Sequence, residues 1–109
     1  MMSEQVANAL SKNEKLKKSV LRNFFTEQGS LKHLPSQLKK RLIVLEHLAH
    51  QLNPKKKYTE KEFNEFIKPL NEDYATIRRE LFIHKFVNRN NDIYEVNEPG
   101  DWRDWRTLN

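Results

Sequence analysis

The chain has 109 residues and a formal net charge of +5, and it is 37 % hydrophobic and 32 % charged. This length allows one domain with one hydrophobic core, and the composition fits a compact domain with a well-solvated surface. The absence of cysteine excludes disulfides, thiolate metal ligands and cysteine nucleophiles. No apolar run approaches the roughly 20 residues that cross a bilayer, and no secretory signal is recognisable, so we expect a cytoplasmic protein without a membrane partner.

The charge is unevenly distributed along the chain. Residues 1–57 carry twelve lysines and arginines against four acids, a net charge of +8, whereas residues 58–109 carry eight against eleven, a net charge of −3. A basic half is typical of a nucleic-acid-binding surface or of a domain with an anionic protein partner, but it also arises from ordinary solvated helix faces. Composition leaves these interpretations equally open.

The first half of the chain predicts two helices with a short strand between them. Residues 1–11 are expected to be flexible, and apolar residues then recur at helical spacing over 12–25. Alternation of apolar and polar residues over 30–34 predicts a strand. A continuous apolar stripe over 36–52 predicts the second helix, and the three lysines at 55–57 are expected to form an exposed turn.

The second half of the chain predicts two short helices and a β-hairpin. Thr59 and Glu62 have the spacing of a capping box, in which each side chain accepts from the backbone N–H of the other residue. Asn90, Asn91 and Asp92 are typical turn residues between two apolar segments. The predicted elements are a helix over 59–68, a helix over 73–85, and strands over 86–89 and 93–96.

This order of elements predicts a mainly α fold with a small β-hairpin, namely a winged helix-turn-helix with an extra N-terminal helix. About four residues separate the two short helices, which suits a helix-turn-helix, and the hairpin would be the wing. We expect the winged-helix domain to span residues 12–98 and a C-terminal tail to span residues 99–109.

The C-terminal tail contains two tryptophans, Trp102 and Trp105, with Arg103 and Arg106 directly after them. The tail could fold back and cover apolar surface, or it could present an aromatic anchor to a partner or a second copy of the chain. We favour the first interpretation, because uncovered aromatic patches are a liability in small domains.

Three stretches of the sequence resemble a known family: KRLIVL at 40–45, YTEKEFN at 58–64 and DYATIRREL at 73–81. On these stretches, the segment from Phe24 to Tyr94 is similar to the bacterial domain-of-unknown-function family numbered two-zero-eight-seven. The resemblance implies a winged helix-turn-helix and a protein similar to transcriptional regulators.

The expected function is DNA binding, because the second helix of a helix-turn-helix lies in the major groove. Helical spacing places Thr76 and Arg79 on the outward face of the predicted helix over 73–85, where arginine can pair bidentately with guanine. Phosphate contacts are expected from the wing tip and from the lysine run before the helix-turn-helix. The expected nucleic-acid contacts are Thr76, Arg79, Arg89, Asn90, Lys55, Lys56 and Lys57.

The charge of the predicted helix-turn-helix favours an alternative. Residues 58–85 carry five lysines and arginines against six acids, a net charge of −1, whereas DNA affinity depends largely on neutralising phosphates. Arg79 could instead form surface ion pairs with Glu72 or Glu80, and Arg78 is expected to pair with a carboxylate of a neighbouring helix. The alternative function is a protein–protein interaction module that uses the winged-helix fold without DNA.

No metal site, cofactor site or catalytic site is expected. His47 and His50 have a spacing that can ligate a metal, but no cysteine or carboxylate is predicted to join them on that face. The helix over 36–52 is half apolar on this face, which predicts cover by the N-terminal helix or by a second copy of the chain. Since no nucleophile, base and phosphate-binding loop converge in the sequence, we expect a protein that is not an enzyme.

Overall fold

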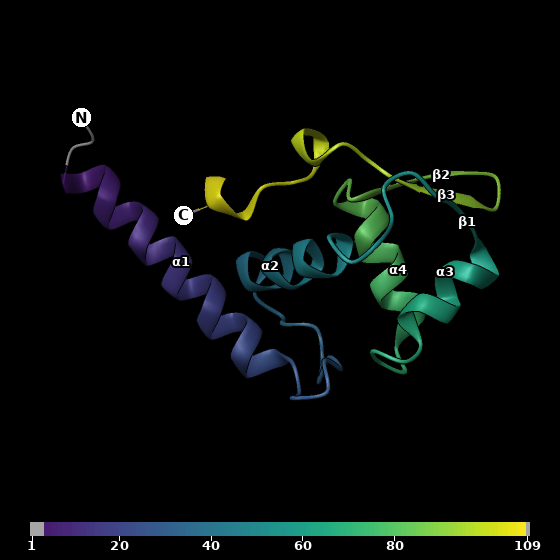
Figure 1. Cartoon of the computed structure of the whole chain (residues 1–109), viewed down its shortest axis with the longest axis horizontal. Helices are drawn as coiled ribbons and strands as arrows, with labels where there is room; N and C mark the ends of the chain where they lie inside the picture. The colour runs from purple at the N-terminus through teal and green to yellow at the C-terminus, as the bar shows by residue number, and fades with distance from the viewer. Residues whose placement is uncertain (1–3, 109) are drawn as a thin grey trace.

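The computed structural model describes the backbone of residues 4–108 and the side chains of residues 12–108. Over these residues the chain is mostly helical and has one three-stranded antiparallel sheet (Figure 1). None of the described helices is both long enough and apolar enough to cross a membrane. The elements in chain order are α1 (Glu4–Phe24), α2 (Leu38–Ala49), β1 (Lys57–Thr59), α3 (Glu60–Ile67), α4 (Tyr74–Ile83), β2 (Val87–Asn90), β3 (Ile93–Val96), and the 3-10 helices η1 (Pro99–Asp101) and η2 (Trp105–Thr107).

The helix α2 is the centre of the molecule, with α1 packed on one side and α4 on the other (Figure 1). Its apolar residues are buried almost all the way round the helix. Ile43 is fully buried, and the ring of His47 meets the edge of Phe25, directly after α1, with 5.0 Å between ring centroids. The N-terminal helix therefore covers the face of α2 for which the sequence predicted cover by that helix or by a second copy.

The N-terminal helix is longer than predicted. It begins at Glu4 rather than at Lys12, so its backbone extends through most of the segment for which we expected flexibility. Residues 1–3 of that segment lie outside the described residues.

The predicted strand over 30–34 is wrong. Only an isolated bridge between Phe25 and Leu31 forms there. The backbone N–H of Leu31 donates to the carbonyl of Leu70 at 2.8 Å, and its own carbonyl accepts from the side chain of Asn71 at 2.8 Å. These backbone groups bond to the α3–α4 turn and not to a neighbouring strand, so residues 30–34 do not extend the bridge into a β-ladder. The α1–α2 loop is thereby fastened to the α3–α4 turn.

The predicted capping box at the start of α3 is confirmed. The hydroxyl of Thr59 accepts from the backbone N–H of Glu62 at 3.1 Å, and the carboxylate of Glu62 accepts from the N–H of Thr59 at 3.0 Å. The bond from the backbone N–H of Thr59, followed by that from Lys56, lowers the pKa of Glu62, because a donor to the carboxylate favours its ionised form. The start of α3 is thus fixed by local chemistry that the sequence already displays.

The turn between α3 and α4 is longer than predicted, because residues 68–73 lie between the two helices. Asp73 occupies the N-cap position of α4, but its side chain makes no capping bond. Instead the side-chain oxygen of Asn71 accepts from the backbone N–H of Asp73 at 2.8 Å. The turn therefore owes its shape to an Asx turn at Asn71.

The helix α4 ends at Ile83 rather than at Lys85 as predicted. Lys85 has a left-handed backbone, with φ of 70°, which cannot continue a right-handed helix. The N–H of Lys85 donates to the carbonyl of Phe82, and the N–H of Phe86 donates to that of Leu81. This is a Schellman motif, which turns the chain sharply into β2.

The sheet has one strand more than the sequence predicted. The predicted hairpin is confirmed as β2 and β3, but Lys57, which was expected in an exposed turn, begins β1. This strand pairs with β3, so the sheet order is β1-β3-β2. The face toward α3 is aromatic: Phe63 lies 4.8 Å from Tyr94 and 6.1 Å from Tyr58 between ring centroids.

The C-terminal tail folds back onto the domain, as the favoured interpretation predicted. Trp102 packs against His50 and Phe86 with ring centroids 4.9 Å and 5.3 Å away, and its indole N–H donates to the carbonyl of Asn97. Trp105 is 1 % exposed. Both rings belong to the same hydrophobic core as α2 and α4.

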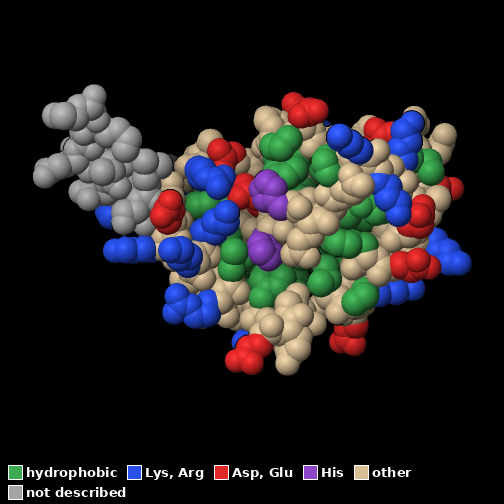
Figure 2. All heavy atoms as spheres, viewed as in Figure 1, with side chains coloured by type: hydrophobic (Ala, Val, Ile, Leu, Met, Phe, Trp, Pro, Cys, Tyr) green, Lys and Arg blue, Asp and Glu red, His purple; other side chains and the backbone are tan. Residues whose placement is uncertain are grey.

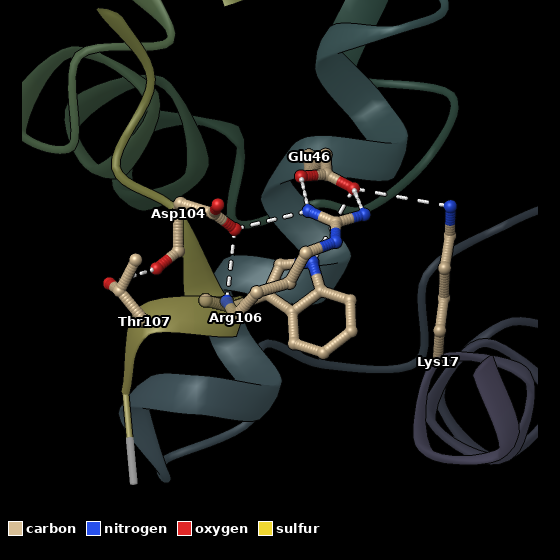
Figure 3. Close-up of polar contacts among 6 residues, drawn as sticks. Lys17, Glu46, Asp104, Arg106 and Thr107 are labelled. Atoms are coloured by element: carbon tan, nitrogen blue, oxygen red, sulfur yellow. Dashed lines mark hydrogen bonds and ion pairs between the residues drawn. The ribbon is translucent and has the colours of Figure 1, made fainter. Parts of the chain in front are cut away.

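A buried carboxylate anchors the tail to α2 and α1, and no feature of the sequence singled it out. Glu46 is 7 % exposed and accepts from both terminal guanidinium nitrogens of Arg106, at 3.1 Å and 3.2 Å, and from the indole N–H of Trp105 at 3.4 Å. The ammonium of Lys17 lies 4.0 Å away on its other side (Figure 3). These hydrogen bonds raise the pKa of Arg106. The carboxylate is thus compensated from three directions, as a buried charge requires.

Two histidines in this structure predict a loss of stability in acid. Burial lowers the pKa of His84 below its ordinary value of 6.5; Glu80 opposes this shift, whereas Arg103 and Arg41 add to it. Burial is also the main cause of the lowered pKa of His47. Between these folded pKa values and 6.5 the unfolded chain binds more protons than the folded chain, so the free energy of unfolding falls as the pH drops through this window.

Urea unfolding at a series of pH values from about 7.5 to about 5.5 measures this effect. We expect the double substitution His84→Asn and His47→Asn to flatten the profile. The matched control is His33→Asn, which removes an exposed histidine. If the stability of the double variant falls as steeply with pH as that of the wild type, His84 and His47 are not the cause of the acid sensitivity.

Candidate nucleic-acid interface

The outward surface of α4 carries the two residues that the sequence selected as base contacts. Ile77 and Leu81 are buried and fix the inner side of the helix. Arg79 is consequently exposed, and Thr76 is half-buried. The arginine forms neither of the ion pairs considered for it, because Glu80 instead lies 3.0 Å from Arg41 on α2. Within the described side chains, Arg79 makes no ion pair at all.

A shallow hollow of about 140 Å³ lies between α3, α4 and the hairpin. Arg79 and Arg89, which the sequence selected separately, both line it. Ala75, Phe82 and Tyr94 also line it. The structure thus brings one predicted base contact and one predicted phosphate contact to the same concave surface.

The same hollow contains a carboxylate that is already engaged. Glu60 lies 3.8 Å from the guanidinium of Arg78, which confirms the predicted pairing with a neighbouring helix. It also accepts from the phenol of Tyr94 at 3.2 Å. Burial raises the pKa of Tyr94, so the phenol remains a donor at neutral pH. Arg78 donates in addition to the side chain of Asn64, so its role is to hold α4 against α3.

Most of the predicted phosphate contacts are already in ion pairs. Lys56 lies 3.3 Å from Glu62, Lys57 lies 3.5 Å from Glu95, and Arg89 lies 3.5 Å from Asp92. All three are exposed, and such surface pairs are worth only about 0–1 kcal/mol, so a phosphate can replace the carboxylate. Lys55 is also exposed, and no acid among the described residues pairs with it.

The sheet register divides the predicted contacts between two faces. Arg89 pairs with Tyr94 and therefore lies on the face toward α3, with its guanidinium over the tyrosine ring. Lys57 pairs with Glu95, one residue further along, and so lies on the opposite face. Asn90 also falls on that opposite face, by alternation from Arg89. The seven predicted contacts therefore form no single continuous surface.

Two apolar side chains are exposed at the end of α4. Phe82 is 44 % exposed and Ile83 is 51 % exposed. Sequence reasoning assigned neither residue a role. Helical periodicity contained the signal, because Ile77 and Leu81 set the buried side of α4, and the two residues that directly follow Leu81 point away from that side.

The charge of the molecular surface differs between its two ends. In Figure 2 lysines and arginines dominate the end that holds α1, whereas acids and bases alternate at the end that holds α3, α4 and the hairpin. His47 and His50 lie between these ends in aromatic contacts with Phe25 and Trp102. No three histidines, aspartates or glutamates gather into a possible metal site in the described part of the chain.

The comparisons with known proteins identify a family without a characterised function. The model of an uncharacterised protein family conserved in bacteria, DUF2087, matches residues 30–96, which run from the α1–α2 loop through β3. No curated protein and no solved structure matches the chain significantly. Since the match covers more than half of the 109 residues, the chain belongs to the DUF2087 family.

Proposed function

We propose that this protein is a winged helix-turn-helix domain that binds duplex DNA, with α4 in the major groove, and that it is not an enzyme. The observation that carries the proposal is the placement of Arg79 and Arg89 on one hollow between α4 and the hairpin. A recognition helix and a wing approach DNA together from such a surface, one toward the bases and the other toward the backbone.

The topology supports this proposal independently of the side chains. Two short helices joined by a turn are followed by a hairpin, and β1 joins the hairpin on the β3 side. In this arrangement α2 and α3 support α4, and the hairpin is the wing beside it. The elements therefore have the order and pairing that a winged helix requires.

The roles of the acids support a function without catalysis. Glu62 caps α3, Glu60 binds Arg78 and Tyr94, and Glu46 anchors the tail. Each of these three carboxylates therefore has a structural partner, which supports a role for them in the fold and not in acid–base chemistry.

The test is the affinity of the chain for random duplex DNA, measured by fluorescence anisotropy over a range of salt concentrations. Arg79→Ala should weaken binding by about 1–3 kcal/mol if the residue pairs with a base, or lower the slope of log K against log salt by about one unit if it contacts a phosphate. The matched control is Arg103→Ala, which removes one positive charge from the tail. Equal effects of the two substitutions would contradict a special role for α4.

A second candidate function is protein recognition by the same end of the molecule. Phe82 and Ile83 favour it, because exposed apolar side chains beside an arginine are typical of protein interfaces. The anisotropy experiment separates the two functions. Absence of duplex binding even at low salt would favour the protein-recognition function, since phosphate contacts supply most of the affinity of proteins for DNA.

A further inference from the structure

The outer side of α1 carries a row of cations that the proposed function does not use. Four basic residues follow one another at intervals of three, three and four, so they share one side of the helix. Leu16 and Val20 occupy the opposite side and pack into the core. The row spans about 15 Å at the rise of an α-helix. Its members are Lys12, Lys15, Lys18 and Arg22.

No acid among the side chains of residues 12–108 pairs with the cations of this row. All four side chains are exposed. Lys17, on the inner side of the same helix, is different because it faces Glu46. The basic residues of the hairpin and of β1 also differ, since Arg89 and Lys57 are in ion pairs. Within the described side chains, the row is thus a strip of unpaired positive charge on one side of α1.

We propose that this row is a second contact surface for duplex DNA, which binds the phosphate backbone without reading sequence. Each strand of a duplex places one phosphate about every 3.4 Å along its axis, so a row of about 15 Å runs beside roughly four phosphates. The helix α1 lies on the far side of α2 from α3 and α4 (Figure 1). The inference therefore goes beyond the proposed function and does not depend on it.

The composition of α1 argues against a membrane or a protein as the partner of the row. A helix that lies on a membrane needs a free apolar face, but Leu16, Val20 and Phe24 are already packed into the core. A protein interface usually has an apolar centre, whereas the exposed neighbours of the row are the polar residues Glu14, Ser19 and Asn23. Long flexible cations without apolar neighbours fit a phosphate backbone.

The test replaces the row in the full chain and measures binding of random duplex DNA over a range of salt concentrations. The row variant carries Lys12→Gln, Lys15→Gln, Lys18→Gln and Arg22→Gln. A control variant loses the same charge elsewhere on the surface through Lys32→Gln, Lys61→Gln, Lys68→Gln and Lys85→Gln. All eight positions are exposed, and glutamine has nearly the helix propensity of lysine at those within helices, so both variants should remain folded, which circular dichroism and thermal unfolding verify.

The row variant should lower the slope of log K against log salt by about three to four units, because each phosphate contact contributes about 0.9. The control variant should change the slope by about one unit or less if the phosphates contact the row itself. Equal losses in the two variants would mean that only net charge matters, and would overturn the proposal.

The Arg79→Ala variant separates this proposal from the proposed function. If Arg79→Ala weakens binding and the row variant does not, the row is not a DNA contact, and the proposed binding of DNA by α4 is supported. If the row variant weakens binding and Arg79→Ala does not, the row is supported and the α4 interface is not. Wild-type binding to anionic phospholipid vesicles but not to duplex DNA would overturn the row as a DNA surface.

Discussion

Replacing Trp105 by alanine should lower the free energy of unfolding by about 3–5 kcal/mol, the range for a fully buried aromatic residue. The ring is 1 % exposed, and its indole N–H donates to the buried carboxylate of Glu46. The substitution removes both the packing and this bond. Since domains of this size are stable by only about 5–15 kcal/mol, the loss is a large fraction of the total. Urea unfolding followed by far-ultraviolet circular dichroism measures it.

Two further variants show which interaction Trp105 contributes. Trp105→Phe loses the indole donor and part of the ring but keeps an aromatic side chain in the core, so it should cost clearly less than the alanine variant. Thr107→Ala, at an exposed position of η2, removes only the hydrogen bond from its hydroxyl to the carbonyl of Asp104, so it should cost no more than about 1.5 kcal/mol. A Trp105→Ala variant as stable as Thr107→Ala would show that the tail is no part of the core. The family match ends at residue 96, so Trp105 lies outside it. The experiment therefore tests whether the core of this domain extends beyond the matched segment.

The second large effect is expected at Phe63, which joins α3 to the sheet. Its side chain is fully buried and contacts the rings of Tyr58 on β1 and Tyr94 on β3. Phe63→Ala should cost about 3–5 kcal/mol, because the space between a helix and a sheet cannot collapse easily. The matched control is Phe66→Ala on the same helix, where the side chain is only half-buried.

The measurement for Phe63 has two parts. Urea unfolding gives the change in stability, and near-ultraviolet circular dichroism reports the packing of the tyrosines. We expect Phe63→Ala to lose both stability and tyrosine signal, and Phe66→Ala to lose less of each. If the two substitutions cost the same, the aromatic cluster does not hold the sheet to α3.

Features specified by neighbouring residues could be predicted from the sequence. The capping box at Thr59 needs only four consecutive residues, and the structure has both of its bonds. The hairpin of β2 and β3 was predicted because its turn residues lie between its strands. The end of α4 was not, since the left-handed residue is Lys85 and not the glycine that usually marks such a position.

Features that depend on remote pairing could not be predicted. The strand β1 has three residues, too few for a periodic pattern, and its partner β3 lies far along the chain. The ion pair between Lys57 and Glu95 follows from that register and was equally invisible. For the same reason Arg79 and Arg89 could be selected one by one as candidates, but their shared hollow emerged only from the fold.

The hydrogen bonds of Asn71 have a consequence for the entropy of recognition. Its side chain holds the carbonyl of Leu31 and the N–H of Asp73 at once, so the turn before α4 is ordered whether or not a ligand is bound. A binding surface that is already ordered loses little conformational freedom when a partner arrives, and this cost often decides the affinity of an interface of given area. The α1–α2 loop, although it lies outside the surface proposed to bind DNA, would therefore favour that binding by preorganisation.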